Sequence, residues 1–146
     1  MFVHRSSYKR LVDTLLPRIK SLRVGTDAGS LISSTPISKL ESLIAESVEQ
    51  GATVLTGGKR FDHPKYPGAS YFEPTLIVDV KMNHAVARNE LFAPVMSVVV
   101  YDDVDEAAGW LNASRFGLGA GVYGENKREC KRVAGLLECG MVAINE

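Results

Sequence analysis

The chain has 146 residues, of which 45% are hydrophobic and 23% charged, and it carries 17 basic and 17 acidic side chains. This length fits one domain with a core of its own, and this composition is that of an ordinary globular protein. A formal charge of zero leaves no basic excess for phosphate contacts, so no nucleic-acid partner is expected. No apolar run approaches the roughly 20 residues of a membrane span, so no membrane segment is expected either.

Two helical patterns occupy the first third of the chain. Ser6 or Ser7 can cap the first helix. Its apolar face consists of Tyr8, Leu11, Val12, Leu15, Ile19 and Leu22. Pro17 predicts a kink or an early end of this helix, because proline removes a backbone donor and clashes one turn back. A second helix is predicted from residues 34–36 to Gly51, with a buried stripe of Ile37, Leu40, Ile44 and Val48.

The middle of the chain reads as strands separated by an irregular segment. Residues 52–56 predict a short strand that ends at Gly57 and Gly58. Residues 59–70 contain two prolines and a glycine without periodicity, which indicates a surface excursion. Residues 71–80 predict a strand in which Pro74 favours an edge or a bulge. The valine-rich run Val95–Tyr101 has the strongest strand pattern of the chain.

The last third continues the alternation. Asp103 and Glu106 resemble an N-terminal capping pair for a helix over residues 103–112. Residues 119–123 predict a small-residue strand, and residues 126–139 predict a helix whose apolar face consists of Cys130, Val133, Ala134 and Leu137. Gly140 is the expected C-cap of that helix, and residues 141–144 form a final strand.

Strands that alternate with helices of this length predict an α/β fold with an open, mainly parallel sheet and flanking helices. We expect Val95–Tyr101, residues 119–123 and residues 141–144 to lie in one sheet. The chain opens and closes next to predicted strands, and a sheet that ends in this way would have uncovered edges. We therefore expect a domain that is truncated at both ends.

Few residues have a pattern suited to chemistry. His4, His63 and His84 are far apart in sequence, and no metal site is expected, so surface or structural roles are favoured. Cys130 lies on an apolar helical face, and Cys139 lies at a helix C-terminus, where the dipole disfavours a thiolate. We therefore expect no catalytic residue among them. Two cysteines are too few for a disulfide scaffold, which favours the cytoplasm or another reducing compartment.

The segment Asn-Glu-Leu-Phe-Ala-Pro at residues 89–94 stands apart from the packing pattern. A carboxylate at Glu90 precedes an aromatic ring at Phe92 by two residues, between a polar loop and a buried strand. On pattern alone this is either an ordinary turn, with Glu90 solvated and Phe92 in the core, or part of a site.

This segment resembles the Glu-x-Phe-Gly-Pro motif of the NAD(P)-dependent aldehyde dehydrogenase superfamily. Tyr-Phe-Glu-Pro-Thr-Leu at residues 71–76 is similar to another strand motif of that family, and Gly57 and Gly58 match the double glycine before it. Residues 116–123 and 140–145 resemble its Tyr-Gly-Leu-Ala-Ala-x-Val-Phe and Gly-x-Val-x-Val-Asn motifs. The motifs stand in the family's order across nearly the whole chain. The irregular segment around residues 65–67 resembles that of a fungal branch of the superfamily.

The resemblance implies a role for two residues. Glu90 would accept hydrogen bonds from the nicotinamide ribose hydroxyls of NAD or NADP, a role that suits a carboxylate, and Phe92 would help to position the nicotinamide. Gly140 and Asn145 match positions near the active site that we interpret as structural. Ala93 replaces the motif's usual glycine and adds a Cβ at a tight place.

The resemblance also implies that parts of the enzyme are absent. Residues 1–146 would be a partial catalytic domain, without the cofactor-binding domain and the segment that carries the nucleophilic cysteine. In the complete enzyme, expected to be a homo-oligomer, that thiolate attacks an aldehyde, hydride passes to NAD(P)+ and water cleaves the thioester. The chain alone is expected to be inactive. The alternatives are a non-catalytic relic or binding module of the same fold, and an unrelated α/β scaffold.

Overall fold

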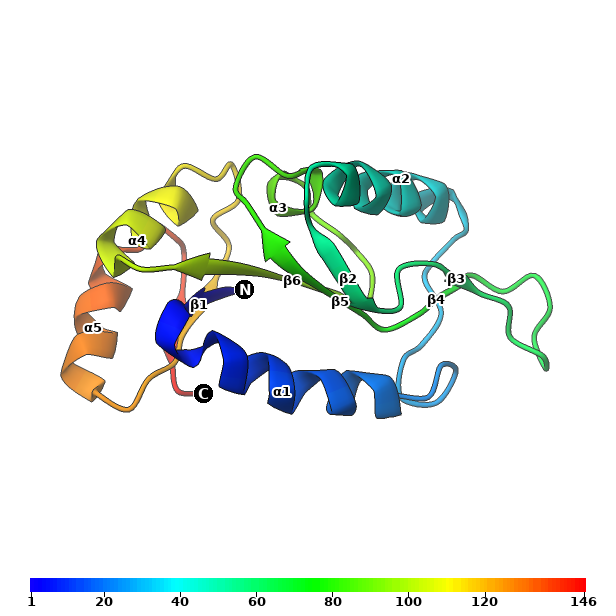
Figure 1. The fold of residues 1–146 in the computed structure, drawn as a ribbon, viewed down its shortest axis with the longest axis horizontal. Coiled ribbons are helices and arrows are strands. Elements are labelled where there is room, and N and C mark those ends of the chain that lie inside the picture. Colours follow the sequence, from blue (N-terminus) through cyan, green and yellow to red (C-terminus); the bar gives the residue numbers. More distant parts are fainter. The chain divides into compact units, whose positions relative to one another are not determined.

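The computed structural model describes residues 1–146 and divides the chain into two compact units, Met1–Val100 and Tyr101–Glu146 (Figure 1). Each unit contains helices and its own paired strands, which confirms the α/β class. None of the helices combines the length and the apolar character that crossing a membrane requires.

The first unit is built on a four-stranded sheet with the order β1-β6-β5-β2. These strands are β1 (Phe2–His4), β2 (Thr53–Thr56), β5 (Thr75–Val80) and β6 (Val95–Tyr101). β5 and β6 are parallel, whereas β2 and β5 are antiparallel. Residues 57–74 contain no helix that could cross over the sheet, so the chain returns from β2 to β5 in the opposite direction. The sheet is therefore mixed, with its antiparallel strand β2 at one edge.

The prediction that three strands share one sheet is wrong. β6 belongs to the four-stranded sheet, whereas β7 (Ala120–Val122) and β8 (Val142–Ile144) pair with each other in a separate two-stranded sheet. The physical reason lies in β6, which has β1 on one side and β5 on the other. Both of its edges are already hydrogen-bonded, so no later strand can join it there.

Helix α1 (Arg5–Ser21) lies along one side of the four-stranded sheet and α2 (Thr35–Glu49) along the other (Figure 1). The α1 side has a buried cluster of Val3, Leu76, Val78 and Val98, against which Tyr8, Leu11, Val12, Leu15, Leu16 and Ile19 pack. Of the two effects predicted for Pro17, a kink or an early end, the early end does not occur, since α1 continues to Ser21 and Ile19 still packs on this cluster. The cap is His4, whose ring accepts a hydrogen bond from the Ser6 amide, and not Ser6 or Ser7.

Helix α2 begins with Pro36 in its first turn, as predicted, but its buried stripe differs at one position. Val48 is 44% exposed, whereas Ser47 is fully buried. Ser47 continues the spacing of Ile37, Leu40 and Ile44 and satisfies its hydroxyl with the Leu43 carbonyl. Helical phase therefore decided burial here, and side-chain polarity did not.

Three short elements complete the first unit. The predicted strand over residues 71–80 is split at Pro74 into β4 (Tyr71–Phe72) and β5. β4 pairs in an antiparallel two-stranded sheet with β3 (Arg60–Phe61), which lies inside the predicted surface excursion. Helix α3 (Ala85–Arg88), which the sequence pattern did not predict, precedes the segment that carries Glu90.

The second unit has a smaller apolar core. Its buried residues are Ala107 and Ala108 of α4 (Val104–Asn112) and Cys130 of α5 (Lys127–Leu136). β7 and β8 are parallel, with Ala120 opposite Val142. Gly140 is not the C-cap of α5, because Leu137 ends that helix; the Gly140 amide instead donates to the Gly117 carbonyl.

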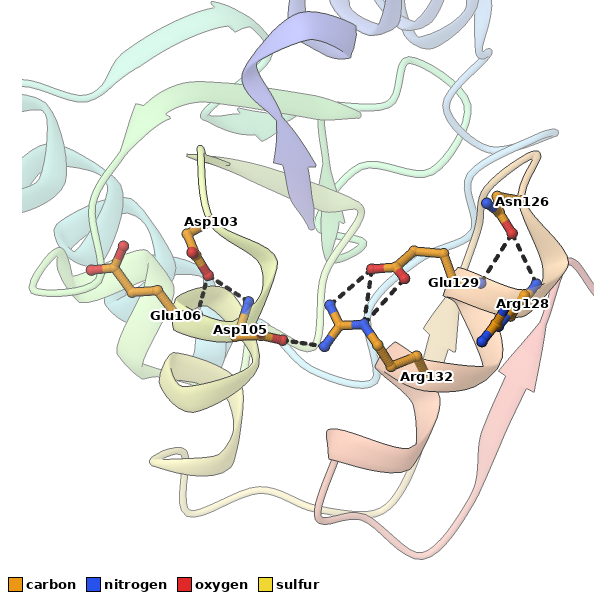
Figure 2. A network of polar contacts seen from close by, with 7 residues as sticks. All are labelled: Asp103, Asp105, Glu106, Asn126, Arg128, Glu129 and Arg132. Carbon is orange, nitrogen blue, oxygen red and sulfur yellow. Dashed lines mark hydrogen bonds and ion pairs between the residues drawn. The ribbon is translucent and has the colours of Figure 1, made fainter.

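Polar contacts connect α4 and α5 (Figure 2). Arg132 on α5 forms ion pairs with Asp105 on α4 at 2.6 Å and with Glu129 at 2.8 Å. Asp103 caps α4, as predicted, by accepting hydrogen bonds from the Asp105 and Glu106 amides. Asn126 caps α5 in the same way (Figure 2). The hydrogen bonds from the Glu106 and Asp105 amides hold the pKa of Asp103 below its ordinary value. The hydrogen bond from Arg132 lowers the pKa of Glu129.

Candidate functional site

The segment over residues 89–94 connects α3 to β6 and enters β6 at its amino end. Asn89 ends α3 in an extended conformation, and its side-chain amide donates to the Ala85 carbonyl at 2.9 Å. At the other end, the Pro94 carbonyl accepts a 2.8 Å hydrogen bond from the Thr75 amide of β5. The segment has no regular secondary structure, yet both of its ends are fixed to regular elements.

Glu90 and Phe92 project from this segment into solvent. The Glu90 side chain is exposed and has no hydrogen-bond or ion-pair partner in the structure. Phe92 is 78% exposed, so the reading that places this ring in the core is wrong. An ionised carboxylate with unused acceptors can bind a diol, and an exposed ring offers an apolar face beside it. These two residues can therefore bind a ligand that carries a diol next to a flat apolar group.

Ala93 introduces no backbone strain at the position where the motif usually has glycine. The only non-glycine residues with a positive φ are Asp79 and Asn145. The Ala93 amide donates to the Leu91 carbonyl at 2.8 Å, and its own carbonyl accepts from the Val95 amide. The methyl group is therefore tolerated without a left-handed backbone.

Three motif segments of the first unit contact one another. A Cβ at Gly57, where φ is +72°, would lie 2.5 Å from the Pro74 carbonyl oxygen, so only glycine fits. The Gly58 amide donates to the Thr75 hydroxyl at 2.8 Å. Since the Thr75 amide in turn binds Pro94, the double glycine, the strand motif and the Glu90 segment form one continuous set of contacts.

The two motif segments of the second unit also pair with each other. They form β7 and β8, and the Gly140 and Gly117 backbones meet just before these strands. Asn145 adopts a left-handed φ of 55°, and its side-chain amide exchanges two 2.9 Å hydrogen bonds with the Gly124 backbone. The side chain thus continues the pairing where the strand ends, which agrees with a structural role.

The cysteines and histidines lie in structural surroundings. Cys130 is 4% exposed, and the Cys139 thiol donates to the Met141 carbonyl. No group of three or more histidine, cysteine or carboxylate side chains could hold a metal ion. His63 contacts the rings of Phe61, Tyr66 and Tyr71. His84 is 1% exposed and occupies the N-cap position of α3 without a capping hydrogen bond from its side chain.

Two buried polar residues that contact α3 and the turn before it, Ser47 and His84, were not predicted from the sequence. The Ser47 hydroxyl accepts a 3.1 Å hydrogen bond from the Val86 amide of α3. His84 accepts one from the Lys81 amide through Nδ1, while its Nε2 has no partner. Helical phase was the available signal for Ser47, whereas no local pattern marked His84 as buried.

Comparison with known proteins shows the family. The model of the aldehyde dehydrogenase family matches residues 1–146. The chain is 38% identical to an aldehyde dehydrogenase-like protein of Saccharomyces cerevisiae, 39% to one of Schizosaccharomyces pombe and 36% to a betaine aldehyde dehydrogenase of Vibrio vulnificus. These matches cover 100%, 95% and 99% of this chain but only 24%, 28% and 31% of the relatives.

Solved structures of aldehyde dehydrogenases and related dehydrogenases are also similar to this chain. A 3,6-anhydro-L-galactose dehydrogenase in complex with NAP superimposes with a TM-score of 0.91 at 29% identity, over 100% of this chain and 32% of that one. A succinate-semialdehyde dehydrogenase from Burkholderia pseudomallei gives 0.88 at 36% identity, over 99% and 30%. The chain thus spans about a third or less of the proteins it matches. It belongs to the aldehyde dehydrogenase family.

Proposed function

We propose that the complete protein containing this chain oxidises an aldehyde to a carboxylic acid with NAD+ or NADP+. Family membership supports the reaction class, and the solved relative with NAP bound supports the cofactor class. The chain spans only part of its relatives, so the nucleophile and the adenosine-binding part of the cofactor site are proposed to lie in the rest of the protein.

Within this chain, we assign to Glu90 and Phe92 a part of the nicotinamide pocket. The observation that carries this proposal is an unpartnered, exposed carboxylate two residues from an exposed ring, on a segment held at both ends. Glu90 would accept hydrogen bonds from the ribose hydroxyls, and Phe92 would contact the nicotinamide. The bound cofactor would supply the hydride acceptor. The chain's own contribution is to hold the ribose in one orientation, which raises the rate through positioning.

Substitution of Glu90 tests this assignment in the complete protein. Glu90→Gln keeps the shape but loses the charge, and a hydrogen bond to a charged group contributes roughly 1.5–3 kcal/mol. We expect weaker NAD(P)+ binding and a single-turnover hydride transfer slower by about ten- to a hundredfold. The matched control is Glu49→Gln, another exposed glutamate without a partner. An unchanged hydride-transfer rate in Glu90→Gln would refute the assignment.

We also propose that the 146-residue chain by itself has no aldehyde dehydrogenase activity. Cys130 is buried, and Cys139 is hydrogen-bonded to a backbone carbonyl, so neither is placed as a nucleophile. The test mixes the purified chain with NAD+ or NADP+ and a panel of aldehydes and follows nicotinamide reduction by absorbance. Turnover that Cys130→Ser or Cys139→Ser abolishes would overturn this proposal. If the complete protein is also inactive, the chain is instead part of a non-catalytic relative.

A further inference from the structure

The buried polar residues of the first unit gather around the segment that leads to Glu90. Only Ser47, Thr75 and His84 are both polar and fully buried there. Ser47 bonds to the Val86 amide, His84 bonds to the Lys81 amide, and the Thr75 backbone bonds to Pro94. Each of these three residues therefore has at least one hydrogen bond to a backbone group within residues 81–94, although the Thr75 hydroxyl itself bonds to Gly58 and Glu73.

Ser47 makes the longest-range of these side-chain contacts. Its hydroxyl donates to the Leu43 carbonyl at 2.8 Å and accepts from the Val86 amide at 3.1 Å, so both its donor and an acceptor site are used. Val86 is 3% exposed and lies in the first turn of α3, where a helix provides no acceptor for its own amides. Without the Ser47 oxygen, this amide would be buried and unsatisfied, so α3 would shift or loosen.

Asn89 transmits the position of α3 to Glu90. Its side-chain amide returns to the Ala85 carbonyl, and its backbone leaves α3 in an extended conformation directly before Glu90. Beyond Glu90, the next contact with the sheet is the one between Pro94 and Thr75. If α3 loosens, the segment is held only from its far end.

We propose that Ser47 is a positioning residue for Glu90, acting through α3 and Asn89. This inference rests on the proposed function, since it assigns Ser47 to the same nicotinamide pocket. Ser47 itself touches neither substrate nor cofactor. It fixes the start of the segment, so that the Glu90 carboxylate meets the ribose in one orientation.

The test compares Ser47→Ala with Ser42→Ala in the complete protein. Ser42 lies on the same helix and makes the same contact with the carbonyl four residues earlier, but it is exposed and has no long-range partner. In Ser47→Ala, we expect hydrogen exchange of the Val86 amide to rise at least about tenfold. We also expect the KM for NAD(P)+ to rise and hydride transfer to slow by roughly tenfold or more. The KM for aldehyde should stay unchanged, and Ser42→Ala should match the wild type.

Asn89→Ala, which removes a side chain that is only partly buried, provides a second variant in case Ser47→Ala does not fold. It should raise the KM for NAD(P)+ without changing exchange in the four-stranded sheet. The positioning role is overturned if exchange at Val86 or cofactor kinetics do not change in Ser47→Ala, or if both variants change only overall stability. A wild-type protein that neither oxidises aldehydes nor binds NAD+ or NADP+ by calorimetry removes the proposed function, and the positioning role with it. An active wild type with a normal Ser47→Ala variant removes the positioning role alone.

Discussion

Each of the two units of the chain is stabilised internally by a different kind of contact. Met1–Val100 has a buried apolar core of branched and aromatic side chains on both sides of its sheet. In Tyr101–Glu146 only two alanines and a cysteine are buried, and its elements are joined by side chains that bond to backbone groups. Where little apolar area is buried, helix caps and side-chain hydrogen bonds between elements contribute more to holding the elements in place.

The largest effect is expected in the core of the first unit. Leu76 is fully buried in the cluster beneath α1, so Leu76→Ala should lower the free energy of unfolding by about 2–5 kcal/mol. Denaturant titration followed by circular dichroism measures this loss. The control, Leu118→Ala, removes a side chain that is 92% exposed in the second unit and should change stability by less than about 0.5 kcal/mol. Equal losses would mean that the two units do not differ as described.

A smaller effect is expected from Asn112, which joins the ends of α4 and α5. Its amide donates to the Leu136 carbonyl and accepts from the Glu138 amide. Asn112→Ala removes both hydrogen bonds and should cost about 1–3 kcal/mol, whereas Asn112→Asp keeps the acceptor and should cost less. The fluorescence of the single tryptophan, Trp110 in α4, reports this unit during denaturation. If the alanine variant is as stable as the wild type, polar cross-connections do not hold the second unit.

The cap of α5 should contribute less again. Asn126→Ala leaves the Arg128 and Glu129 amides without their acceptor and should cost about 1 kcal/mol. Asn126→Ser, which retains a capping oxygen, should recover most of that loss. A serine variant no better than alanine would show that the cap's hydrogen bonds are unimportant here.

The smallest effect concerns pH. Asp103 and Glu129 both have lowered pKa values, so their contribution to stability is fully present above their ordinary values near 4 and is lost as the pH falls through the lowered ones. Arg132→Gln should raise the pKa of Glu129 towards its ordinary value. The pKa of Asp103 should change less, because hydrogen bonds from backbone amides are the main cause of its lowered value. Carboxyl titration by NMR separates the two, and an equal shift of both would contradict this assignment.

Elements with long local patterns were predictable from the sequence, and pairings between distant residues were not. β6 begins and ends at the predicted residues, and α2 starts at Thr35, within the predicted residues 34–36. Four-residue α3 is too short to show a helical period, and the two edges of β6 are occupied by strands far from it in sequence.

In the candidate site, too, the local motif was predictable from the sequence and the contacts between distant residues were not. The motif singled out Glu90 and Phe92, and the exposure of both agrees with a binding role. The side chains that hold their segment were not apparent, because a serine in the apolar phase of a helix resembles a surface residue by type. Only the fold shows that its hydroxyl meets an amide 39 residues away.

That separation has a consequence for the order in which the chain folds. The Ser47–Val86 bond can form only after α2 has packed on the sheet, because the closure of so long a loop is entropically unfavourable until other contacts have closed it. α3 has only four residues and cannot be stable in isolation. We therefore expect the Glu90 segment to become ordered last during folding and to open first in the native state. A chain that has already acquired its sheet would thus not hold Glu90 in the position that we propose for ribose binding until this final step.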